Sequence, residues 1–260
     1  MSSLKKLDFF VLILLALLGI PTVIFFHANF LASTLVFLGA PSAYLLIRKT
    51  QNLKIIYSGV FLIGILLGFG FDFLATFNNS WLIPDSQLTI HYRIFGAAPV
   101  DEIICLILWT LLMLLVYEHF FERKRVEKLH IRHFVYAGIV PAFLTIVFIL
   151  ASLHFRPSLI TFGYAYLVLG SLATLPLIYF IFHNPKLLGR VIKPAPYFIF
   201  LYLTFELTSL YLKQWSFSGQ YIGHIQLLSF SFPLEELFFW IIVSSTVVLA
   251  DYKMLVDTDK

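Results

Sequence analysis

The sequence has little charge and almost no cysteine. Charged residues make up 12% of its 260 residues, about half the fraction usual for a soluble domain, and 60% of the residues are hydrophobic. The single cysteine, Cys105, lies in an apolar stretch and allows no internal disulfide. No cluster of cysteine and histidine suggests a metal site. This composition excludes an ordinary soluble domain and predicts a multi-pass membrane protein.

Eight apolar stretches are long enough to cross or nearly cross a bilayer, which takes about 20 residues. We therefore expect an all-α membrane bundle of about eight transmembrane helices. The expected spans are Leu7–Phe26, Phe30–Leu46, Leu53–Phe77, Val100–Phe121, Phe134–Leu153, Leu159–Phe182, Val191–Leu212 and Leu234–Ala250. The first follows two lysines, as a signal peptide does. It lacks a small-residue cleavage site and is longer than the apolar part of a usual signal peptide, which favours a retained helix.

Lysine and arginine concentrate in every second loop. The basic positions flanking spans on one side are Lys5, Lys6, Arg48, Lys49, Lys54, Arg123, Lys124, Arg125, Lys128, Arg132, Lys186, Arg190, Lys193 and Lys253. The loops on the other side hold only Arg93, Arg156 and Lys213. Because basic loops stay in the cytoplasm, this pattern predicts an integral membrane protein with both termini cytoplasmic. It also accounts for the basic patches without a nucleic-acid partner.

Several landmarks recur at one separation along the chain. Pro99-Val-Asp-Glu and Pro233-Leu-Glu-Glu lie 134 residues apart, since 233 − 99 = 134. The same separation relates Asp72 to Glu206 and Trp81 to Trp215. A shared register of this kind predicts a duplicated chain. We expect two parallel four-helix repeats, residues 1–126 and 127–260, because an even number of spans keeps both copies in one orientation.

The predicted topology places the intramembrane acids at one depth. These acids are Asp72, Asp101, Glu102, Glu206, Glu235 and Glu236. Two fall late in spans that run outward, and the two acidic pairs open the spans that run back. An acid in hydrocarbon costs about 2.5–3.5 kcal/mol by insertion scales and is a functional candidate by default. We hypothesise that packing of the halves brings the acids around a shared cavity.

Three interpretations compete for these acids. A proline followed by acids suits the start of a helix and its dipole, although Asp72 and Glu206 fall late in their spans. Inward-facing acids also form proton or ion relays. The third interpretation is acid–base catalysis on an apolar substrate, because burial beside a second carboxylate favours a protonated carboxyl group. Phe238 and Phe239 lie within one turn of Glu235, and aromatic faces stabilise cations.

The segment Pro233–Trp240, with the sequence PLEELFFW, resembles a motif of the membrane-integral lycopene cyclases, which are two-domain carotenoid cyclases. That family carries Pro-x-Glu-(Glu/Asp) in each half, often followed by Phe-Phe. Phe71–Asn79 and Arg93–Glu102 echo its first-half pattern, so the resemblance covers nearly the whole chain in two copies. The first copy departs from the pattern, with Asp101-Glu102 and no aromatic pair after it. This departure suits a positioning or deprotonating role for the first pair.

The resemblance implies an isomerase that cyclises the ψ-ends of lycopene or a related polyene to ionone rings. Glu235 or Glu236 would protonate a terminal alkene, and a neighbouring alkene would attack the resulting tertiary cation. Asp101 and Glu102 would form the second acidic set. Asp72 and Glu206 would stabilise the cation or take the final proton. The reaction is redox-neutral and consumes no cofactor, and no G-x-G-x-x-G segment suggests the flavin-dependent class of cyclase.

The expected substrate contacts come from both halves of the chain. They are Pro99, Pro233, Phe238, Phe239, Trp240, Arg93, Trp81 and Trp215. Arg93 either holds one carboxylate ionised or caps the membrane interface. The lipophilic polyene would enter from the membrane lipid. Two alternatives stay open: a proton- or ion-translocating protein, and a carotenoid 1,2-hydratase in which water captures the cation.

Overall fold

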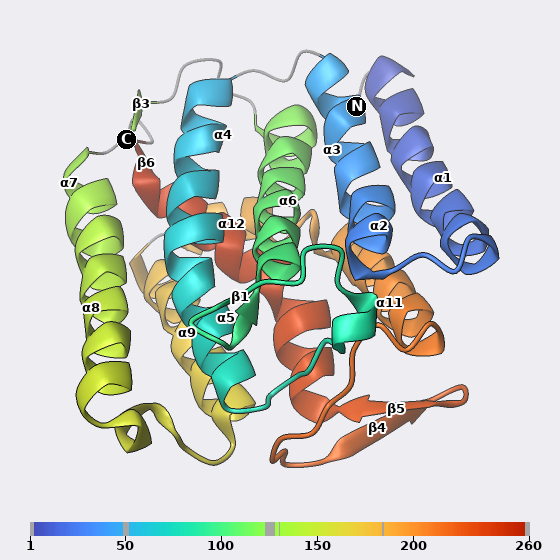
Figure 1. The fold of residues 1–260 in the computed structure, drawn as a ribbon. Coiled ribbons are helices and arrows are strands. Elements are labelled where there is room, and N and C mark those ends of the chain that lie inside the picture. The colour runs from blue at the N-terminus through green and yellow to red at the C-terminus, as the bar shows by residue number, and fades with distance from the viewer. Residues whose placement is uncertain (1–2, 49–51, 123–127, 130, 184, 258–260) are drawn as a thin grey trace.

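The computed structural model describes residues 3–48, 52–122, 128–129, 131–183 and 185–257. The chain forms a bundle of long helices, with both termini at one end and a β-hairpin at the other (Figure 1). Seven of the described helices are long and apolar enough to cross a membrane. The chain is therefore a multi-pass membrane protein. The predicted repeat boundary between residues 126 and 127 lies outside the described residues.

The long helices follow the expected spans closely. In chain order they are α1 (Ser3–Phe25); α2, η1 and α3 (Phe30–Thr34, Leu35–Gly39, Ala40–Ile47); α4, η2 and α5 (Leu53–Gly59, Val60–Leu67, Gly68–Phe77); α6 and η4 (Val100–Val116, Tyr117–Phe121); α7, η5 and α8 (Ile131–His133, Phe134–Ile139, Val140–Phe155); α9 (Ala165–His183); α11 (Ala195–Tyr211); and η7 and α12 (Glu236–Val243, Ser244–Leu255). Short helices η3 (Asp85–Gln87), η6 (Pro157–Ile160) and α10 (Pro185–Val191) lie in the connections.

Three of the predicted spans differ from the structure, and the last of them continues to Leu255 beyond the expected end at Ala250. The sixth begins at Ala165 rather than Leu159, because Pro157–Ile160 forms a separate 3₁₀ turn. The seventh, α11, has 17 residues and is slightly short for a membrane crossing, and it is the one expected span outside the seven long apolar helices.

Five of the long helices contain a wider, π-helical segment: η1, η2, η4, η5 and η7. A π-helix bonds residue i to residue i+5, so side chains no longer repeat every 3.6 residues. η7 begins at Glu236 itself. The spacing of 3.6 residues per turn assumed for Glu235, Phe238 and Phe239 therefore does not apply in this segment.

Among the described residues, strands pair only in short antiparallel ribbons. β1 (Arg93–Ile94) pairs with β2 (Ala98–Pro99), and β4 (His224–Leu227) pairs with β5 (Phe230–Pro233). β3 (Lys128–Leu129) pairs with β6 (Val256–Asp257) beside the C-terminus. The β1–β2 ribbon leads directly into α6, and the β4–β5 ribbon leads toward η7. The two ribbons therefore set where these two helices, which have acidic residues at their starts, begin.

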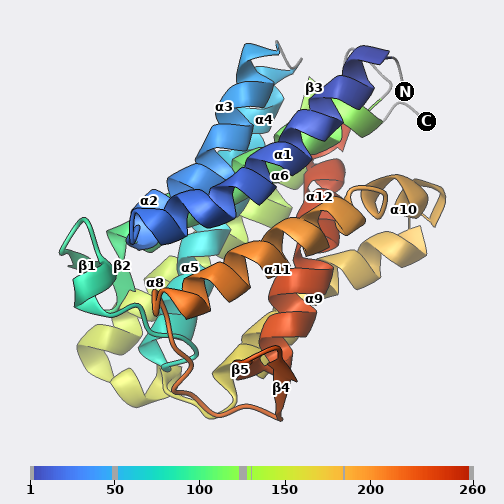
Figure 2. The same cartoon turned by 90° about the vertical axis from the view of Figure 1, so that its right-hand side faces the viewer.

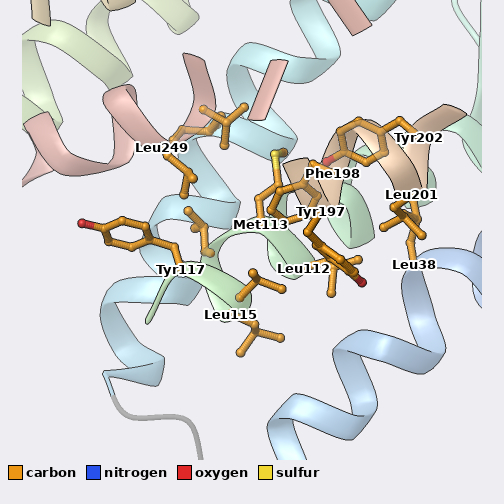
Figure 3. Close-up of a cluster of buried hydrophobic side chains, with 14 of the residues drawn as sticks. Leu38, Leu112, Met113, Leu115, Tyr117, Tyr197, Phe198, Leu201, Tyr202 and Leu249 are labelled. Atoms are coloured by element: carbon orange, nitrogen blue, oxygen red, sulfur yellow. The ribbon is translucent and has the colours of Figure 1, made fainter. Parts of the chain in front are cut away.

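Helix α6 lies at the centre of the bundle (Figure 1) and packs on the segments around it, including η2, α3 and α12. Its middle residues form a buried cluster with side chains of η1, α11 and α12 (Figure 3). Leu112, Met113 and Tyr117 are fully buried in this cluster. From the side, α1 and α11 lie against each other (Figure 2), with the rings of Phe9 and Tyr197 5.9 Å apart. The centre of the bundle is thus a continuous apolar core.

Buried ion pairs join helices at the end that carries the termini. Asp8 of α1 bonds Arg48 and His119, both at 2.8 Å. At the other side of this end, Lys253 of α12 forms an ion pair with Glu122 at 2.9 Å, and both side chains are almost completely buried. A buried charge must be paired, because an isolated ion in a low-dielectric environment is very costly.

We expect Lys253→Met to destabilise the protein by about 3–5 kcal/mol, because it removes the buried cation that pairs with the Glu122 carboxylate at 2.9 Å. Thermal or denaturant unfolding in detergent micelles measures the loss. Lys54→Met removes an exposed lysine and serves as the matched control. Equal stability of the two variants would contradict the assignment.

Candidate functional site

Each acidic pair follows a β-ribbon that ends in proline. Pro99 precedes α6 with extended backbone angles (φ −65°, ψ 141°), and Pro233 is the last residue of β5. A proline suits this position because a helix start leaves its backbone N–H groups without partners inside the helix. In the β1–β2 turn, Gly96 has φ +76°, a conformation that glycine adopts without steric cost. The ribbons therefore position the acids at the helix starts.

The first acid of each pair binds backbone rather than facing a cavity. Asp101 accepts hydrogen bonds from the backbone N–H groups of Thr89 (2.6 Å) and Ile90 (3.0 Å). Glu235 accepts one from the backbone N–H of Ile222 at 2.8 Å. Both carboxylates are buried. Their contacts indicate that these two acids hold the preceding loops in place.

The second acid of the first pair meets the acid of α5. The carboxyl groups of Asp72 and Glu102 lie within hydrogen-bonding reach of each other, although the residues are 30 positions apart. The indole N–H of Trp81 donates a hydrogen bond to Glu102. Asp72 and Glu102 are both buried. We call Asp72 and Glu102 the first carboxyl pair.

A second carboxyl pair is formed by Glu206 of α11 and Glu236 of η7, whose carboxyl groups also lie within hydrogen-bonding reach. The indole N–H of Trp215 donates to Glu206 at 3.0 Å, and the hydroxyl of Tyr166 donates to Glu236 at 2.6 Å. Tyr166 also packs edge-on against Trp81, with ring centroids 5.1 Å apart. An aromatic contact therefore links the two pairs.

Several oxygens of these pairs have no hydrogen-bond donor in the described part of the chain. Both oxygens of Asp72, one of Glu102 and one of Glu206 are in this state. Two neighbouring carboxylates repel when both are ionised, and a single proton shared between them removes the repulsion. Each pair is an arrangement that can hold one shared proton.

Both pairs lie at a cavity of about 610 Å³. Asp72, Glu102 and Glu236 line the cavity. Glu206 is not part of the lining and is a neighbour of Glu236. The rest of the wall is mainly apolar and aromatic and comes from both expected halves of the chain. All four tryptophans of the protein contribute to it: Trp81, Trp109, Trp215 and Trp240. This volume is typical of sites for small organic ligands.

The remaining predicted contacts divide into two groups. Phe239 and Trp240 line the cavity, and Trp240 stacks on Trp109 with centroids 5.0 Å apart. Phe238 is half exposed and turns away from it. Arg93 bonds Asp85 (2.8 Å) and the carbonyl oxygens of Ile83 and Ala97, so it ties a loop together and meets none of the six acids. Pro99 and Pro233 also lie outside the lining.

Sequence reasoning did not single out Tyr166 and Asp251, which both line the cavity. Tyr166 lies one residue into α9, and nothing in its local pattern separates it from the other tyrosines of the chain. Asp251 follows directly after the expected end of the last span at Ala250. Helix α12 continues to Leu255, so Asp251 belongs to the helix, and an acid directly after an apolar run was the available signal.

The loops that carry Trp81 and Trp215 are joined at the hairpin end. Leu82 and Ser216 exchange backbone hydrogen bonds of 2.8 and 2.9 Å. The hydroxyl of Tyr221 donates to the carbonyl of Ser80 at 2.7 Å. Partial burial raises the pKa of Tyr221 to about 12, so its hydroxyl keeps the proton it donates. These bonds hold the two tryptophan-bearing loops together beside the cavity.

The chain has no match among protein-family models, curated proteins or solved structures. Within the described ranges, no group of three or more His, Cys, Asp or Glu side chains is arranged to hold a metal ion. The chemistry that the site offers directly is proton transfer from a carboxyl pair into an apolar, aromatic cavity.

We expect Asp101→Ala to release the loop before α6, because the backbone N–H groups of Thr89 and Ile90 lose their acceptor. Hydrogen–deuterium exchange followed by mass spectrometry should show faster exchange in residues 82–92. Glu102→Gln is the control, since Glu102 makes no bond to this loop segment beyond the Trp81 indole. Unchanged exchange in Asp101→Ala would overturn the anchoring role.

Proposed function

We propose that the protein is a carotenoid cyclase that closes the ψ-ends of lycopene or a related polyene by acid catalysis. The observation that carries the proposal is the pairing of Glu236 with Glu206 at an aromatic cavity inside a multi-pass membrane protein. An uncharged polyene has no polar group to recognise, so its site needs only shape, a proton donor and a way to stabilise positive charge. The resemblance of PLEELFFW to the membrane-integral lycopene cyclases supports the same chemistry.

In the proposed reaction, Glu236 delivers the proton of the second carboxyl pair to a terminal double bond. Tyr166 and Glu206 both contact its carboxyl group and would hold it in place during the transfer. Glu235 is the weaker candidate for the donor, because its carboxylate is engaged with the backbone of Ile222 and does not line the cavity. General acid catalysis of this kind contributes about 10²–10⁴-fold to a rate.

Protonation produces a tertiary carbocation next to the ring carbons still to be joined. Phe239, Trp240 and Trp81 line the cavity near the pairs, and their faces stabilise a cation by about 0.5–2 kcal/mol each. The neighbouring alkene then attacks the cation and closes the six-membered ring. The Glu206–Glu236 pair, which lost its proton in the first step, takes back the proton lost from the ring and is regenerated, while the charge of the Asp72–Glu102 pair stabilises the cation. Atoms and electrons are conserved without any oxidant or cofactor.

We also propose that the chain is a duplication and that its terminus-bearing end faces the cytoplasm. The two carboxyl pairs, their tryptophan donors and the two β-ribbons occur at corresponding places in residues 1–126 and 127–260, which supports the duplication. The concentration of lysine and arginine at the terminus-bearing end supports the orientation.

Expression in a bacterial host that accumulates lycopene should convert red pigment to yellow-orange cyclic product of unchanged mass. Product chromatography with mass spectrometry checks this outcome and separates it from hydration, which adds water. Only unchanged lycopene, with the protein present in membranes, would refute the proposal. Proton flux into reconstituted vesicles without any carotenoid would instead favour translocation.

Glu236→Gln should lower cyclisation about 10²–10⁴-fold, because glutamine keeps the size and the acceptor for Tyr166 but has no acidic proton. Glu235→Gln is the matched control at the adjacent position. Its amide oxygen can still accept from Ile222, so most activity should remain. Product formed per unit of membrane-inserted protein measures both variants. A greater loss in Glu235→Gln would reverse the assignment of the donor.

A further inference from the structure

We infer that the cavity opens sideways into the bilayer between α8 and α9, and that one end of a long apolar chain enters there while the rest stays in the lipid. The identification of this apolar molecule as a polyene rests on the proposed function. The opening itself is argued from the walls and packing of the cavity. We call the residues Pro141, Thr145, Leu172, Ala173 and Pro176 the portal residues.

The portal residues belong to the cavity wall and to the outer surface at the same time. Thr145 and Pro141 come from α8, and the other three come from α9. Leu172 is 55% exposed, and Pro141 and Ala173 are also exposed. All of them lie well inside the membrane-crossing segments, so the surface they expose faces hydrocarbon. A cavity with such a wall is only partly enclosed.

Helices α8 and α9 both contact α5, and each also packs on a neighbour of its own. At Gly138 an added Cβ would lie 2.3 Å from Leu62, and at Gly70 it would lie 3.2 Å from Thr145, so the α8 helix is pressed against η2 and α5. At Gly170 an added Cβ would lie 2.4 Å from Phe239, so α9 is pressed against η7. Among the described residues α8 and α9 share at most isolated contacts. The space between them is therefore not closed by helix packing.

The length of the cavity indicates what occupies it. Its wall extends along one helix from Glu236 to Asp251, which is 15 residues or roughly 20 Å. An extended chain rises about 1.2 Å per backbone atom, so an acyclic polyene of forty carbons, about 32 of them in its main chain, measures roughly 35–40 Å. Such a molecule exceeds the cavity, and the excess must leave through the lateral opening. The site thus takes one end at a time.

The hairpin end offers no comparable route. The bonds between Leu82 and Ser216 and from Tyr221 to Ser80 join the loops over that end. A polyene is also nearly insoluble in water and is dissolved in the bilayer. It therefore reaches the cavity from the bilayer. The charge-free lining of the portal residues fits such a ligand and excludes an ion or a polar metabolite.

The four tryptophans report occupancy directly, because all of them line the cavity. The protein in lipid vesicles is titrated with a long-chain dibromoalkane, which quenches indole fluorescence at contact. A phospholipid brominated on its acyl chains serves as the probe that stays outside. We expect the dibromoalkane to quench wild-type fluorescence well beyond the phospholipid.

Ala173→Phe narrows the opening and should raise the half-quenching concentration of the dibromoalkane several-fold. Leu175→Phe adds a similar ring to the lipid-exposed face of the same helix, away from the cavity wall, and should leave quenching unchanged. Leu172→Ala widens the opening and should quench at least as readily as wild type. Identical quenching of Ala173→Phe and Leu175→Phe, or no excess quenching in wild type, would overturn the portal.

The same variants separate this inference from the proposed function. Excess quenching that depends on Ala173 in a protein that forms no cyclic product would support the portal and refute the cyclase. Cyclisation by Ala173→Phe at the wild-type rate, together with identical quenching, would refute the portal and leave the cyclase standing.

Discussion

Two carboxyl groups that face each other in an apolar interior cannot both carry a charge, and this constraint governs the arrangement of the site. Asp72 meets Glu102, and Glu206 meets Glu236, at the same cavity. Each pair needs a shared proton and nearby donors, and Trp81, Trp215 and Tyr166 supply the donors. The loops and ribbons around the pairs serve to bring these donors into place.

The adjacent acids Asp101 and Glu235 show how burial can serve two different purposes at neighbouring positions. Each is buried, and each accepts hydrogen bonds from backbone N–H groups: Asp101 through both oxygens and Glu235 through Oε1. The pair of glutamates in PLEELFFW is thus a structural acid followed by a candidate proton donor.

Helix positions could be read from the sequence because an apolar run of about 20 residues has few alternatives in a bilayer. Phe30–Ile47 and Val100–Phe121 match their expected spans at nearly every boundary. The separation of 134 residues also led to both acids of each carboxyl pair. The sequence did not show which acid of an adjacent pair lines the cavity and which binds a loop. Glu235 and Glu236 are identical residues at consecutive positions, so no local pattern distinguishes them.

Local sequence patterns also could not predict the parts of the site that depend on long-range packing. Tyr166 reaches Glu236 across 70 residues of chain, and no periodicity links them. The π-helical start of η7 changes which aromatic side chains face inward, so Phe239 lines the cavity and Phe238 faces outward. Arg93 was expected either to hold a site carboxylate ionised or to cap the membrane interface; its direct partner is the loop acid Asp85, and its charge also acts on Glu102.

The roughly 20 Å reach of the cavity has a kinetic consequence for a substrate with two reactive ends. A chain of which only half fits must withdraw and turn around before its second end can react. Its singly closed form would then return to the lipid pool after each turnover and compete with fresh substrate. The balance between one-ringed and two-ringed products would follow pool size and residence time, so membrane composition would help to set the product ratio.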